Sequence, residues 1–211
     1  MSTVPDPIDP PEGLSYGEPT WDITRLFPLQ GYWTEQEYLD LDTNQLVEFS
    51  DGFVEFLPMP KLSHQLIAHF LHCLLEAFVS ARGLGTVVGA PYKVRLWEKK
   101  YREPDVIFVR SEHASWLGED FSDGADLVME VVSDAPSDRN RDLVKKREEY
   151  ARAGIPEYWI IDRELEQITV LVLEGSAYAV HGVFRRGQQA TSKLLAGFAV
   201  EVTAVLEAAK R

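Results

Sequence analysis

The stretch DLVMEVVSDAPSDRNRDLVKKREEYARAGIPEYWIID, residues 126–162, decides the fold. It opens with an apolar run rich in valine, continues as a charged segment, and closes with a second apolar run, EYWIID. Gly154, with Pro156 just beyond it, is a typical end of a helix. The stretch therefore predicts a strand, a helix from about residue 137 to residue 153, and another strand.

Upstream of this unit, short apolar runs are separated by turn-forming or charged segments such as EKKYRE, residues 98–103. The runs TVVG, APYKVRLW and DVIFVR have strand composition, and we expect them to join residues 127–132 as successive strands of one sheet. Apolar residues recur at helical spacing over residues 63–82, which predicts a core helix closed by Gly83. The pair Asp51-Gly52, between LVEFS and FVEFL, predicts a β-hairpin.

This order of helices and strands predicts an α/β (α+β) fold with a mixed central sheet flanked by helices. The 211 residues are 45% hydrophobic, which is enough for one sizeable core. We divide the chain into an extended arm rich in proline and acids, residues 1–30, and a single domain, residues 31–211. Thr34 and Glu37 fit a capping box and predict a short helix near the start of that domain.

The charge and the cysteine content exclude several classes of protein. The net charge of −13 argues against a protein that coats nucleic acid by bulk electrostatics, although residues 1–60 hold 12 acids and one base, so the remainder is nearly neutral. A single cysteine, Cys73, rules out an intrachain disulfide. The start of the chain lacks the pattern of a signal peptide, and the apolar window at residues 66–79 is too short to span a bilayer. We expect a cytoplasmic protein without membrane contacts.

Two carboxylates stand out because each lies in or beside a predicted strand, where an unpaired charge is costly. Asp105 follows Pro104 and opens the run VIFV, and Glu130 lies inside LVMEVV. Each is either a structural carboxylate paired with a neighbouring base or part of a functional site. Their occurrence on consecutive strands favours the functional interpretation.

Asp142, Lys146 and Tyr150 are spaced four residues apart, so they lie along one face of the predicted helix. The same helix carries many other charges. Composition alone therefore leaves two interpretations open, a solvated stripe of ion pairs and one wall of a site.

The segments PYKVRLW, EPDVIFV, DLVMEVVS and DLVKKREEYARAGIPEYWIID, in this order and spacing, resemble the Uma2 family of endonucleases, a branch of the restriction-endonuclease-like PD-(D/E)xK superfamily. The hairpin VEFSDGFVEFLPMP, followed by SHQLI, resembles the opening segment of the family. The resemblance covers about residues 34–162. It implies a restriction-endonuclease-like fold and metal-dependent hydrolysis of phosphodiesters.

The resemblance also assigns roles to individual residues. Asp105 matches the acid of the PD motif and Glu130 the acid of the ExK motif, which bind Mg²⁺ or a similar ion such as Mn²⁺ in the superfamily. Hard cations prefer oxygen ligands, which explains these residue types. The carbonyl of Val131 is a candidate third ligand.

The sequence departs from the superfamily pattern at the lysine of ExK, because Val132 stands there. The family pattern D-xxx-K-xxx-Y transfers the role of that lysine to Lys146, which the neighbouring Lys145 could also fill. We prefer Lys146 because it shares a helix face with Asp142 and Tyr150, which we expect to support the site.

Two further residues match polar positions of the family's opening segment. Glu48 is either an additional metal or hydrogen-bonding ligand or an exposed acid on a strand. His64 either contacts phosphate or water at the site or is an ordinary surface histidine. His69 and His72 lie among apolar residues without an obvious third ligand, so we do not expect them to bind zinc.

These observations lead us to expect a Mg²⁺-dependent endodeoxyribonuclease that hydrolyses phosphodiester bonds of DNA. A homodimer would suit this activity, because one active site cuts one strand. The alternative is a catalytically inactive module of nuclease fold that binds nucleic acid or protein, which Val132 and the excess of acids favour. A third option, a metal-free hydrolase with Asp105 and Glu130 as acid and base, predicts activity that survives EDTA.

Overall fold

The computed structural model describes residues 27–41, 43, 45–133, 139 and 141–210, with the side chains of Arg141 and Asp142 left out. Most of the predicted arm, residues 1–26, lies outside this part. The helices are α1 (Glu35–Leu39), α2 (Leu62–Ser80), the 3₁₀-helix η2 (Ser111–Trp116), the π-helix η3 (Arg141–Lys145), α4 (Lys146–Arg152) and α5 (Val202–Ala208). The strands are β1 (Val47–Ser50), β2 (Phe53–Phe56), β3 (Gly85–Gly89), β4 (Lys93–Trp97), β5 (Lys100–Arg102), β6 (Val106–Arg110), β7 (Phe121–Ser122), β8 (Leu127–Val131), β9 (Glu157–Asp162), β10 (Gln167–Glu174), β11 (Ala177–Arg185), β12 (Gln189–Thr191) and β13 (Ala199–Glu201).

The main sheet has six strands in the order β11-β10-β9-β8-β6-β3. It is mixed, since β8 and β9 run parallel whereas the other neighbouring strands are antiparallel. The parallel pair is the strand–helix–strand unit predicted from residues 126–162. Its two strands are apolar throughout their centres because both faces of the sheet are covered.

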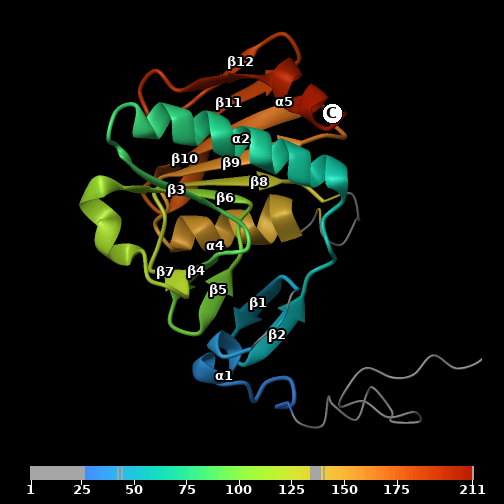
Figure 1. Ribbon diagram of the computed structural model, residues 1–211, viewed down its shortest axis with the longest axis vertical. Helices are drawn as coiled ribbons and strands as arrows, with labels where there is room; N and C mark the ends of the chain where they lie inside the picture. Colours follow the sequence, from blue (N-terminus) through green and yellow to red (C-terminus); the bar gives the residue numbers. More distant parts are fainter. Residues whose placement is uncertain (1–26, 42, 44, 134–138, 140, 211) are drawn as a thin grey trace, which may run out of the picture.

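Helices cover the two faces of the main sheet (Figure 1). The long helix α2 packs on one face together with α5, and α4 lies on the other face. Strand β8 shows the alternation: Leu127 and Met129 pack towards α2, whereas Val128 belongs to the cluster on the α4 side. The prediction of a mixed sheet flanked by helices is confirmed.

A second sheet lies on the far side of α4, in the order β2-β1-β5-β4-β7 (Figure 1). The prediction that the run APYKVRLW joins TVVG, DVIFVR and residues 127–132 in one sheet is therefore wrong, because β4 turns into the hairpin partner β5 and pairs away from the main sheet. The charged segment at residues 98–103, which we expected only to separate strands, contains β5. This smaller unit, hereafter the hairpin sheet, has its own aromatic core, made by Trp33, Tyr38, Phe49 and Tyr101 with Val47 and Val54.

The local signals read from the sequence correspond to the observed elements. Thr34 and Glu37 form a reciprocal capping box at the start of α1. Strands β1 and β2 form the predicted hairpin, and its turn residues Asp51 and Gly52 both have positive φ angles, which favours Asp-Gly there. The core helix predicted over residues 63–82 is α2, followed by Gly83 in the left-handed region.

In the described part of the chain, α2 is the helix whose length and apolar composition would allow it to cross a membrane. One of its faces, however, includes Ile67, Leu71 and Leu75, which are fully buried against the main sheet. Its apolar character is thus accounted for by the core of the domain.

Candidate active site

Asp105 and Glu130 lie side by side at one end of the main sheet. Strands β6 and β8 pair antiparallel, with Val106 opposite Met129, and one further step in this register places Asp105 opposite Glu130. Because side chains alternate across a strand, both carboxylates project on the α4 side, with Ile107 and Val128. The sheet thus brings together the two acids that the sequence singled out.

Asp105 is held by the backbone of the neighbouring strand and by a histidine from α2. Its Oδ2 accepts a 2.7 Å hydrogen bond from the Val131 N–H. The Nε2 atom of His64 lies 3.3 Å from the same oxygen and 3.0 Å from the Val131 carbonyl oxygen. Two oxygens of the predicted metal-ligand set therefore converge on one point, now taken by an imidazole nitrogen.

Opposing effects act on the pKa of His64. Burial lowers this pKa, but the hydrogen bond to Asp105 and the negative charges of Asp105 and Glu130 raise it more. The net result is a pKa above the usual value. The neighbouring carboxylates thus stabilise the protonated form of the imidazole.

Glu130 is 3% exposed, and two side chains from α4 donate to its Oε1 atom. The Lys146 Nζ lies 2.7 Å from this oxygen and the Tyr150 hydroxyl 2.6 Å. Both donors come from one helix face, as their spacing of four residues predicted. Burial and the charge of Glu130 raise the pKa of Tyr150 well above its usual value, so the phenol stays protonated and can donate.

Lys146 and Lys145 occupy different environments. Lys146 is 3% exposed and contacts Glu130, whereas Lys145 is exposed and lines a neighbouring cleft. The structure thus places Lys146, and not Lys145, against the acid of the ExK position. The side chain of Asp142, the third residue of the predicted stripe, lies outside the described part.

Glu48, from the hairpin sheet, lies beside Lys146. Together with Asp105, Glu130 and Lys146 it forms a group of charged side chains, hereafter the carboxylate cluster. Glu48 is 1% exposed, so the interpretation as an exposed strand acid is wrong. Its Oε2 pairs with Arg102, and its Oε1 lies 3.7 Å from the Lys146 Nζ and accepts no hydrogen bond. A buried carboxylate oxygen without a hydrogen bond is costly in a purely structural role.

Arg102 connects the hairpin sheet to the helix that carries Lys146. Besides Glu48, its guanidinium donates to both oxygens of Glu149 on α4, over 2.7 and 2.9 Å. Lys100 pairs with Glu149 as well, at 2.7 Å. The cations Arg102 and Lys100 keep the pKa of Glu149 below its usual value although burial opposes this. Sequence reasoning missed Arg102 and Glu149, because the strand containing Arg102 reads as a charged turn.

A second acid near the cluster, Glu103, has an unusual environment. Burial raises the pKa of Glu103 to about 7, and the charge of Glu48 adds to this, against the lowering effect of Lys93. Its carboxylate accepts a hydrogen bond from the Val47 N–H at 3.2 Å. Glu103 therefore changes its charge near neutral pH.

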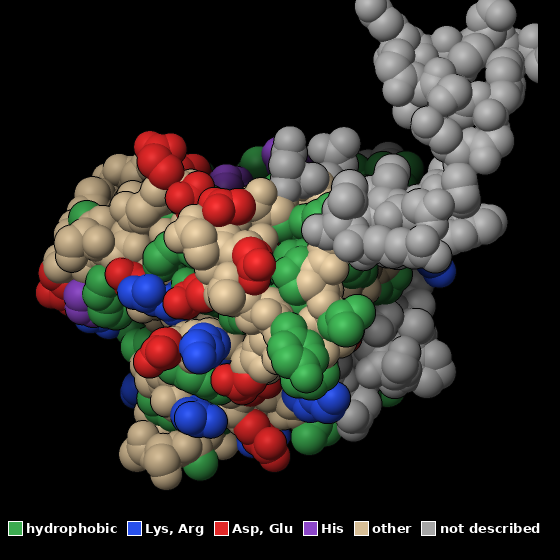
Figure 2. Space-filling view, turned by 90° about the horizontal axis from the view of Figure 1, so that it is seen from below, with side chains coloured by type: hydrophobic (Ala, Val, Ile, Leu, Met, Phe, Trp, Pro, Cys, Tyr) green, Lys and Arg blue, Asp and Glu red, His purple; other side chains and the backbone are tan. Residues whose placement is uncertain are grey.

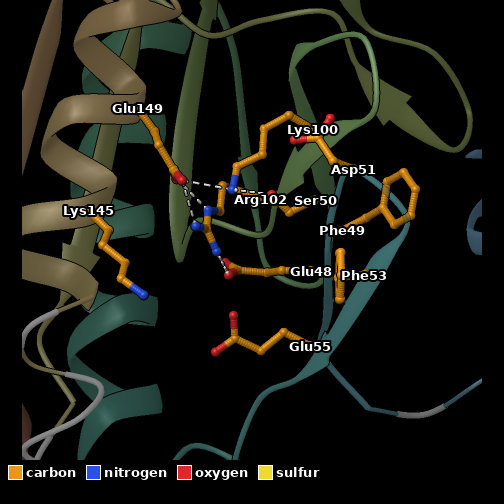
Figure 3. Close-up of a pocket in the computed structure, with 10 residues that line it drawn as sticks. All are labelled: Glu48, Phe49, Ser50, Asp51, Phe53, Glu55, Lys100, Arg102, Lys145 and Glu149. Atoms are coloured by element: carbon orange, nitrogen blue, oxygen red, sulfur yellow. Dashed lines mark hydrogen bonds and ion pairs between the residues drawn. The ribbon is translucent and has the colours of Figure 1, made fainter. Parts of the chain in front are cut away.

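A cleft of about 430 Å³ opens between the hairpin and the start of α4, next to Glu48 (Figure 3). Glu48, Glu55 and Phe53 line it from the hairpin, and Lys145 extends into it from the opposite wall. Glu48 is thus shared by this cleft and the carboxylate cluster.

The oxygen atoms of this cluster suit a hard divalent cation. No group of three or more His, Cys, Asp or Glu side chains among the described residues is arranged to hold a metal ion. The predicted ligands are the carboxylates of Asp105 and Glu130 and the Val131 carbonyl. So small a set suits Mg²⁺, which usually binds one or two carboxylates and retains several water ligands. The unsatisfied Oε1 of Glu48 beside them is a further oxygen donor without a hydrogen bond. The residues present therefore fit such an ion.

Two comparisons with known proteins found similar proteins described as nucleases. A family model described as "Uma2: Putative restriction endonuclease" matches residues 35–204. A crystal structure titled as a "putative nuclease belonging to DUF820" from Anabaena variabilis is similar, with a TM-score of 0.69 and 14% sequence identity, over 84% of this chain and 99% of that chain. At this identity the likeness concerns the fold. No curated protein matches the chain.

Proposed function

The chain belongs to the Uma2 family of restriction-endonuclease-like proteins, and from this premise we propose that it is a metal-dependent endonuclease that hydrolyses phosphodiester bonds of DNA. The observation that carries the proposal is the convergence of Asp105, Glu130 and Lys146 at one end of the main sheet. This is the residue set that the family resemblance implies, although the lysine comes from a helix instead of from the strand of Glu130.

Asp105, Glu130 and the Val131 carbonyl would hold the ion, Mg²⁺ or Mn²⁺, with Glu48 as a further oxygen donor. Once bound, such an ion neutralises phosphate charge and lowers the pKa of a water molecule. The acids come from adjacent strands whose backbone is fixed by the ladder, so their separation is constrained before any substrate arrives. The proposal would also suit a homodimer, in which two sites cut two strands.

Side chains of α4 and α2 would orient the water molecule, stabilise charge on the phosphate and position Glu130. Lys146, held by Glu130, presents a cation that orients a water molecule and stabilises negative charge on the phosphate. Tyr150 keeps Glu130 in place by donating to the same oxygen. His64, whose pKa is raised, donates a hydrogen bond from Nε2 at the edge of the cluster and contacts the phosphate.

Nicking of supercoiled plasmid tests the proposal. The complete protein is incubated with Mg²⁺ or Mn²⁺, with and without EDTA, beside Asp105→Asn, Glu130→Gln and Lys146→Met. We expect nicking by the wild type that EDTA abolishes and that each substitution lowers by at least about 100-fold.

Two other outcomes would identify rival functions. A wild type that binds DNA and the ion but never cuts would mean a binding module that keeps the nuclease fold, the role that Val132 at the usual lysine position favours. Cleavage that persists in EDTA would mean metal-free acid and base catalysis.

A further inference from the structure

The β1–β2 hairpin turns one aromatic side chain towards the cleft. Ser50 pairs with Phe53 and Glu48 pairs with Glu55, so these four side chains share one face of the hairpin. All four line the cleft. Phe53 is 55% exposed, whereas Phe49, which also lines the cleft, projects on the opposite face of the hairpin and is buried in the aromatic core. The tip of the Phe53 ring lies against Gly31, and the rest of the ring is left exposed beside the polar cluster.

The charges of the cleft do not suit a phosphate backbone. Four carboxylates and three cations line it: Glu48, Asp51, Glu55, Glu149, Lys100, Arg102 and Lys145. Figure 2, which views the end of the molecule formed by the hairpin sheet, likewise shows Lys and Arg side chains interspersed with Asp and Glu. Grooves that follow a nucleic-acid backbone are instead strongly positive.

The same lining suits a nucleobase. A base is uncharged, stacks on aromatic rings, and presents amino groups that a carboxylate such as Glu55 can accept from. A volume of about 430 Å³ falls within the usual range of pockets for small ligands, about 300–1,000 Å³. The cleft also adjoins the candidate active site, because Glu48 lines the cleft and lies 3.7 Å from the Lys146 Nζ.

We propose that Phe53 is a stacking platform for an unpaired nucleobase next to the phosphate that is cut. The proposal rests on the proposed nuclease function and narrows its substrate to a single strand, or to a duplex from which one base is turned outwards. Ser50 and Glu55, on the same face, contact the polar edge of this base, and Lys145 approaches the strand from the opposite wall.

The hairpin offers a matched control for the test. Phe56 is the same residue type on the same strand and is 52% exposed, but it pairs with Val47 and so lies on the other face, away from the cleft. The experiment compares the complete wild-type protein with Phe53→Ala, Phe53→Trp and Phe56→Ala. Each is mixed with a short labelled single strand or its duplex in Mg²⁺, and binding is followed by anisotropy and cleavage on a gel.

We expect Phe53→Ala to weaken single-strand binding roughly tenfold or more, because stacking on an aromatic ring contributes that much per base. Phe53→Trp should retain or tighten binding, and Phe56→Ala should stay within about twofold of the wild type. Strands with a single abasic position add a second readout. An abasic site at one position of the strand should weaken binding to the wild type. The same abasic site should not weaken binding to Phe53→Ala any further, because the two changes remove the same contact.

Equal behaviour of Phe53→Ala and Phe56→Ala, or abasic effects that simply add to that of Phe53→Ala, would overturn the stacking proposal. Its failure is separable from failure of the nuclease proposal. If Phe53→Ala cleaves and binds like the wild type, the nuclease proposal stands and the stacking proposal is refuted. If binding depends on Phe53 but no protein cleaves, the stacking contact stands and the nuclease proposal is refuted.

Discussion

The two sides of the candidate active site are built differently. On one side, the sheet wall, Asp105 and Glu130 project from adjacent strands of the main sheet, which is packed on both faces by apolar clusters. The other side, the hairpin wall, is the hairpin sheet, which has its own small aromatic core and contacts α4 through the ion pairs of Arg102 and Lys100 with Glu149. Groups that react need fixed positions, which a sheet supplies. Groups that contact a substrate can stand on a separately anchored wall.

The largest expected effect separates the two neighbouring lysines. Lys146→Met should lower the rate of plasmid nicking by at least about 100-fold, because it removes the cation from the reacting cluster. Lys145→Met should lower the rate by less than about fivefold, because Lys145 lies on the substrate side of the cleft and only contacts the strand.

Rates measured under saturating and limiting DNA sharpen this contrast. The Lys145→Met defect should appear mainly in KM and the Lys146→Met defect in kcat. Thermal unfolding of both variants checks that they are folded. Equal losses in the two variants would contradict the assignment of Lys146.

The next largest effect should come from the joint between the two walls, by which we mean the ion pairs of Arg102 with Glu48 and Glu149. Arg102→Met leaves the buried Glu48 and the half-buried Glu149 without their shared partner, and we expect a loss of about 3 kcal/mol in the free energy of unfolding. Asp123→Asn is the control, because it breaks an ion pair with Arg95 that is more than one-third exposed, where the expected loss is below about 1 kcal/mol. Urea denaturation measures both, and a comparable loss would mean that the joint does not depend on Arg102.

The pH dependence of stability reports on Glu103, behind the hairpin wall. Its folded pKa of about 7 exceeds the ordinary value of 4.5, so the folded state holds this proton more tightly than the unfolded state does. Its contribution to stability is therefore fully present below pH 4.5 and is lost as the pH rises to 7. Glu103→Gln should raise the free energy of unfolding by about 2 kcal/mol at pH 8 and change it little at pH 4. A gain of the same size at both pH values would refute this explanation.

The smallest expected effect concerns the outer edge of the hairpin. The Gln30 side chain donates to the Val54 carbonyl over 2.8 Å and accepts from the Val54 N–H over 2.9 Å, so its amide occupies backbone groups of the edge strand β2. Gln30→Ala should cost about 1 kcal/mol. Hydrogen exchange should speed up at Val54 and remain unchanged in β6 and β8. Faster exchange in β8 as well would mean that the two walls unfold as one.

Much of the sheet wall could be predicted from the sequence, because its signals are local. Strand composition, the end of a helix at Gly154 and the spacing of Lys146 and Tyr150 depend on residues close together in the chain. The family resemblance then supplied the roles of Asp105 and Glu130. These are the features that the structure brings together.

The joint of the hairpin wall could not be predicted in the same way. Arg102 and Glu149 are 47 residues apart, and each lies in a segment with many charges. Nothing local distinguishes a charge that becomes buried in an ion pair from one that remains in water. The same reason explains why β4 and β5 were expected in the main sheet or in a turn, since which strands pair is decided by contacts distant in sequence.

The most direct test of the central claim, that the reacting ion is held by the sheet wall, is calorimetric titration of Mn²⁺ into the complete protein and its variants. We predict one site in the wild type whose affinity falls at least about tenfold in Asp105→Asn and in Glu130→Gln and stays unchanged in Phe53→Ala. Affinity that is the same in all four proteins would contradict the account.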